Sequence, residues 1–95
     1  RRVLFRSKAR LLQIGERYGV FSQVRGRGLL IGCVLSDAWK GKAGAFWAAA
    51  EKEALMVLQA GPDVVRLAPS LIIDEADIDE GLDRFERAIA TLTQA

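Results

Sequence analysis

Apolar and polar residues follow one another in a pattern that predicts a helix and then a hairpin in the first part of the chain. Residues 8–18 place leucine and isoleucine among charged residues at helical spacing. Gly19 suits the left-handed C-terminal cap of that helix. Residues 20–24 and 29–35 are short and apolar, so they predict two strands joined by a turn at Gly26-Arg27-Gly28.

The rest of the chain predicts a helix, a strand and a last helix. An alanine-rich stretch from Ala43 to about Leu58 favours a helix, because alanine has the highest helix propensity. The apolar run 64–73 predicts a strand that stops just past Arg66, because Pro69 lacks the amide donor that sheet pairing needs. The last helix follows the predicted cap Asp74. One apolar stripe marks its buried face: Ile78, Leu82, Phe85, Ile89 and Leu92.

This order of elements predicts an α+β fold, in which a small antiparallel sheet has helices packed on one side. The 95 residues, of which 51% are hydrophobic and 27% charged, correspond to at most one small globular domain. No apolar run approaches the roughly 18 residues that a membrane-spanning helix needs, so we expect no membrane partner.

Arg66 is the candidate functional residue, because it places a permanent positive charge in an apolar strand. A guanidinium in such a strand is costly unless an anion meets it. Two kinds of partner are open at this point. One is a neighbouring Asp or Glu in a structural ion pair, and the other is a carboxylate or phosphate of a substrate or cofactor, held by the guanidinium fork.

The chain contains no histidine and one cysteine, which excludes several classes of site. Ser/His/Asp and Cys/His catalytic groups need a histidine, and zinc sites need several Cys or His ligands. Cys33 lies in an apolar strand with no base to activate it, so we expect a buried thiol and no nucleophile. The sequence therefore predicts no metal site, and its single cysteine fits a cytoplasmic protein.

The positive charge of the chain depends on its first residues. Residues 1–7, Arg-Arg-Val-Leu-Phe-Arg-Ser, match the translation of a common sequencing adapter, and we expect them to be foreign to the natural protein. Without the three arginines among them, the formal net charge would fall by three, from +2 to −1. The domain itself would then be residues 8–95, without a basic character that favours nucleic acid.

The stretch Arg25-Gly26-Arg27-Gly28-Leu29-Leu30-Ile31-Gly32 is similar to two nucleotide-binding patterns but meets neither. Its third glycine is one residue too far for a dinucleotide-binding fingerprint, and it opens a strand where that fingerprint needs a helix N-terminus. As an RNA-recognition signature it lacks the aromatic residues that stack on bases. We therefore expect no nucleic-acid partner.

Acidic residues gather at the start of the last helix. Helix N-termini favour negative charge, so we interpret these residues as a solvated face that complements the helix dipole. The alternative is a metal or acid–base site. The residues are Asp74, Glu75, Asp77, Asp79, Glu80 and Asp83.

Three stretches together resemble the C-terminal domain of class III pyridoxal-phosphate aminotransferases. They are Val24-Arg25-Gly26-Arg27-Gly28-Leu29-Leu30-Ile31-Gly32, then Val64-Val65-Arg66-Leu67-Ala68-Pro69-Ser70-Leu71, and then the helix start from Asp74 to Leu82. Within that class, Val57-Leu58-Gln59-Ala60-Gly61 and the Ala-Pro-Ser-Leu ending are similar to the acetylornithine/succinylornithine transaminase branch. Many members of the class have a second proline where this chain has Ser70.

The resemblance implies a fold type I transaminase, a homodimer whose active site lies between subunits and between a large and a small domain. Arg66 matches the family arginine that reaches this site from the small domain, where it binds a substrate carboxylate or pairs with an active-site glutamate. The Schiff-base lysine and the other groups that hold pyridoxal 5'-phosphate belong to the large domain, and no stretch here matches them. The resemblance therefore implies no catalytic or cofactor-binding residue in this chain, and Arg25, Gly26 and Gly28 carry over only as fold elements.

Two functions are predicted. In the first, the chain is the C-terminal part of an enzyme of arginine metabolism that moves the amino group of N-acetyl- or N-succinylornithine to 2-oxoglutarate. The fragment alone would be inactive. In the second, it is a stand-alone α+β module that binds a small anion or a protein partner through Arg66.

Overall fold

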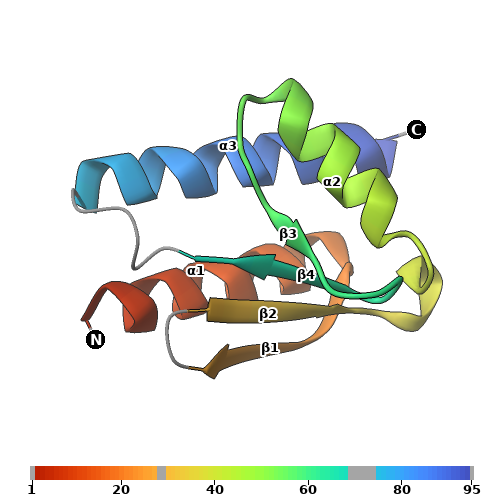
Figure 1. Ribbon diagram of the computed structural model, residues 1–95, viewed down its shortest axis with the longest axis horizontal. Helices are drawn as coiled ribbons and strands as arrows, with labels where there is room; N and C mark the ends of the chain where they lie inside the picture. The colour runs from red at the N-terminus through yellow and green to blue at the C-terminus, as the bar shows by residue number, and fades with distance from the viewer. Residues whose placement is uncertain (1, 28–29, 69–74, 95) are drawn as a thin grey trace.

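The computed structural model describes residues 2–27, 30–68 and 75–94 (Figure 1). Within these ranges the chain forms three α-helices, four strands and one short 3-10 helix, η1. In chain order they are α1 (Arg2–Tyr18), β1 (Phe21–Arg27), β2 (Leu30–Leu35), η1 (Asp37–Trp39), α2 (Ala43–Lys52), β3 (Leu58–Gln59), β4 (Val64–Leu67) and α3 (Glu75–Gln94). The predicted turn residue Gly28, the strand-breaking Pro69 and the helix cap Asp74 lie outside the described residues.

The four strands form one antiparallel sheet in the order β1-β2-β4-β3. β1 and β2 are the predicted hairpin, although β1 continues through Gly26, which pairs with Ile31 and so lies within the strand. β4 ends at Leu67, in agreement with the predicted stop just past Arg66. The sequence does not predict β3, whose two residues pair with β4 at the edge of the sheet.

One face of this sheet is covered and the other is open. Along β2, Ile31, Cys33 and Leu35 are buried, whereas the intervening Gly32 and Val34 are only half-buried. Side chains alternate between the faces of a strand, so the buried set marks the covered face. α1 packs on β1, and α3 packs on both α1 and α2, which together form the helical layer (Figure 1). The predicted α+β fold with helices on one side is therefore confirmed.

α3 provides much of the core beneath this layer. The predicted stripe is confirmed, because Ile78, Leu82, Phe85 and Ile89 are buried and Leu92 packs against them. Phe85 is fully buried and its ring stacks on that of Phe21, with centroids 6.3 Å apart.

The two other helices differ from their predicted bounds. α1 begins at Arg2 and so includes part of the segment 1–7, whose foreign origin stays a prediction. It ends at Tyr18 and is capped, as predicted, by Gly19, which has a φ of +66°. α2 stops at Lys52 and not near Leu58, because Ala54 takes a left-handed conformation with a φ of +58°. The amide of Leu55 then donates to the carbonyl of Ala50, which closes the helix in a Schellman-type cap.

Candidate functional site

Arg66 lies in the middle of β4, on the open face of the sheet. Its Cα is opposite Gly32 of β2 on one side and Leu58 of β3 on the other. The strand is apolar as predicted, but the Arg66 side chain itself is exposed. The reason is the register: Val65 and Leu67 point to the core, and strand alternation turns Arg66 away from it.

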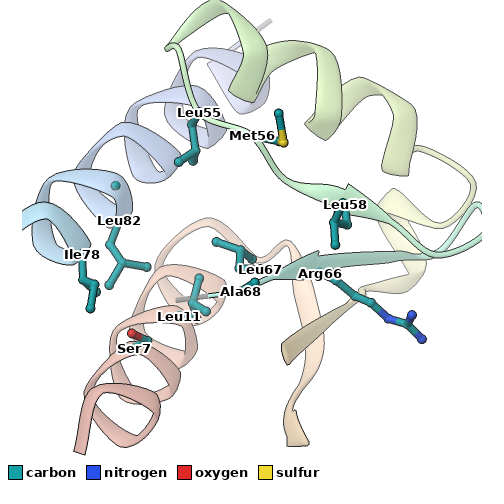
Figure 2. Close-up of a pocket in the computed structure, with 11 residues that line it drawn as sticks. Ser7, Leu11, Leu55, Met56, Leu58, Arg66, Leu67, Ala68, Ile78 and Leu82 are labelled. Carbon is teal, nitrogen blue, oxygen red and sulfur yellow. The ribbon is translucent and has the colours of Figure 1, made fainter. Parts of the chain in front are cut away.

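No hydrogen bond or ion pair of the Arg66 guanidinium is found within residues 2–27, 30–68 and 75–94. The structural ion pair with a neighbouring Asp or Glu is thus not formed among these residues. Figure 2 shows the guanidinium pointing away from the apolar side chains around Leu11 and Leu82. The fork is therefore free to meet an anion that approaches the open face.

A second arginine shares this face with Arg66. Arg25 of β1 is opposite Gly32, so the three residues form one row across β1, β2 and β4. The row lies in a hollow of about 500 Å³, whose lining residues are Arg25, Gly26, Leu30, Gly32, Val34, Val64 and Arg66. The sequence interpretation of Arg25 as a fold element only did not consider this position. The signal that could have indicated the position of Arg25 is the apolar residue before it, Val24, which is buried. Because side chains alternate between the faces of a strand, Arg25 must lie on the opposite face.

The five other arginines whose side chains the structure describes are all paired with carboxylates. Three of them extend from α1 to α3, which run side by side (Figure 1). The N–O distances are 2.6–3.2 Å in the pairs Arg6–Asp79, Arg10–Asp83, Arg10–Glu86, Arg17–Glu86, Arg84–Glu80 and Arg87–Glu53. Asp79 and Asp83 are exposed, as predicted for a solvated face, but they also pair with α1.

The ion pairs between α1 and α3 form a seam along the two helices, and Glu86 lies at its centre. It accepts hydrogen bonds from Arg10 at 2.9 Å, Arg17 at 3.1 Å and the Tyr18 hydroxyl at 3.1 Å. The hydrogen bond from Arg10 is the main cause that lowers the pKa of Glu86 below its usual value, although partial burial opposes the shift. These contacts use the Glu86 carboxylate to hold α1 against α3.

An apolar pocket of about 390 Å³ lies between α1, α3 and the segment that leads from α2 to β3 (Figure 2). Leu11, Leu67 and Leu82 are among its lining residues. Of the described residues that line it, only Ser7 and Arg66 carry a hydroxyl or charged group. Such a surface can bury apolar groups but offers few means to orient a polar substrate.

Cys33 lies on the covered face of β2 and is fully buried. Burial raises the pKa of its thiol to about 12, so the thiolate needed for nucleophilic chemistry does not form near neutral pH. The prediction of a buried thiol is confirmed. Within the described residues, no group of three or more His, Cys, Asp or Glu side chains could hold a metal ion.

The lysines do not fit a covalently bound cofactor. Lys40 pairs with Asp37 at 3.2 Å, and the Lys42 ammonium lies 5.1 Å from the centre of the Trp39 ring. Lys52 is exposed at the end of α2, and Lys8 is half-buried on α1. A Schiff-base lysine needs a site that also binds the cofactor ring and phosphate, and none of these positions provides one.

No helix formed by the described residues is long and apolar enough to cross a membrane.

Comparisons with known proteins agree with the arrangement of these elements. The family model of class-III aminotransferases matches residues 3–89. An acetylornithine aminotransferase of Pseudomonas putida is 72% identical over 89 residues, which are 94% of this chain and 22% of that protein. A succinylornithine transaminase/acetylornithine aminotransferase of Pseudomonas aeruginosa is 65% identical over 89 residues, with the same shares covered.

A solved structure agrees as well. The crystal structure of N-acetylornithine aminotransferase from Stenotrophomonas maltophilia superposes with a TM-score of 0.89 and 46% identity, over 96% of this chain and 25% of that one. The chain thus spans about a fifth to a quarter of the proteins it matches. On the extent of the family match and the identity to these relatives, the chain belongs to the class-III aminotransferases.

Proposed function

We propose that this chain is the C-terminal part of a pyridoxal-phosphate-dependent acetylornithine/succinylornithine aminotransferase. The complete enzyme would move the amino group of an N-acyl-ornithine to 2-oxoglutarate. The observation that carries this proposal is the 65–72% identity to Pseudomonas proteins of these names over 94% of the chain. The stand-alone binding module is not favoured, because the matching proteins carry the same fold within transaminases.

In this enzyme the chain would supply substrate contacts and not the chemistry of the cofactor. Pyridoxal phosphate, bound by the rest of the enzyme, supplies the electron sink for amino transfer. Arg66 would bind a substrate carboxylate with two parallel hydrogen bonds, because its exposed guanidinium has no carboxylate partner among the described residues. The 95-residue chain alone would be inactive. We further expect the complete enzyme to be a cytoplasmic homodimer.

A chimeric enzyme tests this function. The chain replaces the matching 22% of the Pseudomonas putida relative, and amino transfer from N-acetylornithine and N-succinylornithine to 2-oxoglutarate is measured. We expect activity within about tenfold of the parent enzyme. A chimera that folds and binds pyridoxal phosphate but transfers no amino group from either substrate would contradict the proposal.

The role of Arg66 is tested in the same chimera by Arg66→Ala. Loss of a charge-assisted bidentate contact should lower kcat/KM for the carboxylate substrates by about 10- to 100-fold. Arg87→Ala is the matched control, because it removes an exposed arginine of α3 that pairs with Glu53. An unchanged kcat/KM in Arg66→Ala would exclude the carboxylate role.

A further inference from the structure

We propose that position 7 belongs to the apolar core of this domain, and that the natural protein fills it with a large apolar side chain. The serine found there would then come from the foreign segment 1–7. Three features of the structure lead to this proposal, namely the buried face of α1, the unpaired hydroxyl of Ser7 and the space beside it. All three concern packing within the described residues, independently of the proposed function.

The buried face of α1 includes position 7. Ser7 and Leu11 are fully buried and Ile14 nearly so, which gives spacings of four and three residues along the helix. This spacing places the three side chains on one face. Figure 2 shows Ser7 and Leu11 on the side of α1 that is turned toward Ile78 and Leu82 of α3. Position 7 therefore continues the stripe with which α1 packs into the core.

The hydroxyl of Ser7 has no partner at this buried position. Among the residues that the structure describes, Ser7 is the only buried polar or charged residue, and its Oγ makes no hydrogen bond. A hydroxyl that is removed from water without a hydrogen bond is destabilising, because nothing replaces its contacts with water. Protein cores generally pair such groups or avoid them. Serine is therefore a poor residue for position 7.

Space for a larger side chain lies beside Ser7. The residue lines the apolar pocket of about 390 Å³, together with Leu11, Leu67, Ile78 and Leu82. A serine that served to bring α1 close to its neighbours would leave no such space next to it. A large apolar side chain at position 7 can extend into the pocket and bury its surface there. The pocket is thus, in part, the volume of a core side chain that serine lacks.

The two parts of α1 fit the buried face differently. Phe5 is 75% exposed whereas Ser7 is fully buried, which is the reverse of the pattern of an amphipathic helix. After residue 7 the buried positions carry Leu11 and Ile14, although Leu12 is half exposed. The change falls at the end of the segment that matches a sequencing adapter. A segment not selected for this fold would place apolar and polar residues without regard to the buried face.

The ion pair between Arg6 and Asp79 is compatible with a foreign segment. The nitrogen and oxygen are 3.0 Å apart, but both side chains are about half exposed. Exposed pairs of this kind contribute little to stability. They form wherever two helices bring opposite charges close together, so this pair needs no selection for the fold.

Substitution of Ser7 in the 95-residue chain tests the core position. We expect Ser7→Leu to raise the melting temperature by about 5 °C or more, because it removes an unpaired hydroxyl and fills part of the pocket. Ser7→Ala removes only the hydroxyl and should raise the melting temperature by less. Gln13→Leu is the matched control at an exposed position of the same helix, and should change it by less than about 2 °C. A melting temperature that is unchanged or lower in Ser7→Leu would overturn the core position.

The gene provides a second test that does not depend on folding. Sequencing of the source DNA upstream of the Lys8 codon reads the natural residue at position 7. We expect a codon for a large apolar residue there, and no match to residues 1–6 before it. A natural serine, or another small or polar residue, at position 7 would overturn the proposal.

Discussion

Arginines of the helical layer and arginines of the open sheet face differ in their partners. In the helical layer, Arg10 donates to both Asp83 and Glu86, and its pKa is raised mainly by the hydrogen bond to Glu86. On the open face, neither Arg25 nor Arg66 meets a carboxylate among the described residues. The comparison teaches that the arginines which join α1 to α3 are matched within the described fold, whereas Arg25 and Arg66 are not matched by these residues.

The largest difference between the faces should come from valine truncation in β4. Val65 is fully buried on the covered face, and Val64 is half-buried beside it on the open face. Val65→Ala should lower the free energy of unfolding by about 2 kcal/mol, because apolar contacts are lost and a cavity is left. Val64→Ala should lower it by less than about 1 kcal/mol. Urea unfolding of the 95-residue chain measures both, and equal losses would contradict the one-sided core.

Glu86→Gln tests the paired arginines. The substitution keeps the shape of the side chain but removes the charge that Arg10, Arg17 and Tyr18 share. We expect the free energy of unfolding to fall by about 1–2 kcal/mol, since hydrogen bonds to a charged, mostly covered group are lost. Glu80→Gln is the control, because its pair with Arg84 lies within one exposed helix face and should contribute under about 0.5 kcal/mol. Equal losses of unfolding free energy in the two variants would mean that the ion pairs between α1 and α3 stabilise the fold no more than a pair within one helix.

Acid should weaken the same seam. The pKa of Glu86 is lowered in the folded chain, so its contribution to stability is present above the unfolded value near 4.3 and is lost as the pH falls through the lower folded value. We expect the free energy of unfolding to decrease as the pH falls below about 5. The decrease should be smaller in Glu86→Gln, and urea unfolding at several pH values measures it. An identical pH profile in both proteins would assign the acid sensitivity to other carboxylates.

The smallest effect on stability is expected on the open face. Arg25→Gln and Arg66→Gln should each change the free energy of unfolding by less than about 0.5 kcal/mol, because no ion pair among the described residues is broken. Losses above about 1 kcal/mol would show that these arginines serve the fold. Near-zero stability changes, together with a loss of carboxylate binding, would show that these arginines serve a ligand, whereas Glu86 serves the fold.

Much of the fold can be predicted from local patterns in the sequence. The stripe on α3 repeats at helical spacing, and its residues from Ile78 to Ile89 are buried as the spacing predicts. Gly19 ends α1 because glycine adopts the required positive φ at little cost. Such features depend on residues close in sequence, so pattern and propensity suffice to find them.

Other features depend on contacts between distant residues. Alanine favours helix at Ala54, yet α2 has already ended, and Arg84 of α3 donates to the Ala54 carbonyl at 3.2 Å. The two residues of β3 are too few to show alternation, and their pairing comes from β4. Tertiary contacts override local propensity at both places.

Of the two arginines on the open face, the sequence indicated only Arg66 as a candidate site residue. Arg66 attracts attention because it is a charge in an apolar strand, but the sequence does not show which face it occupies. Arg25 becomes significant only when the register of three strands aligns it with Gly32 and Arg66. Register is set by pairing along the whole sheet, so it cannot be predicted from the residue pattern of one strand.

The side-by-side placement of α1 and α3 has a consequence for synthesis of the protein. Arg6 and Asp79 are 73 residues apart in the chain, and the apolar partners of α1 in the helical layer are similarly distant. A growing chain emerges from the ribosome with its N-terminal part first, so α1 is exposed before α3 has been translated. Long-range contacts of this kind slow folding, because a large loop must close before they form. The contacts between α1 and α3 therefore form only after α3 has been translated, whereas those between α1 and β1 can form earlier.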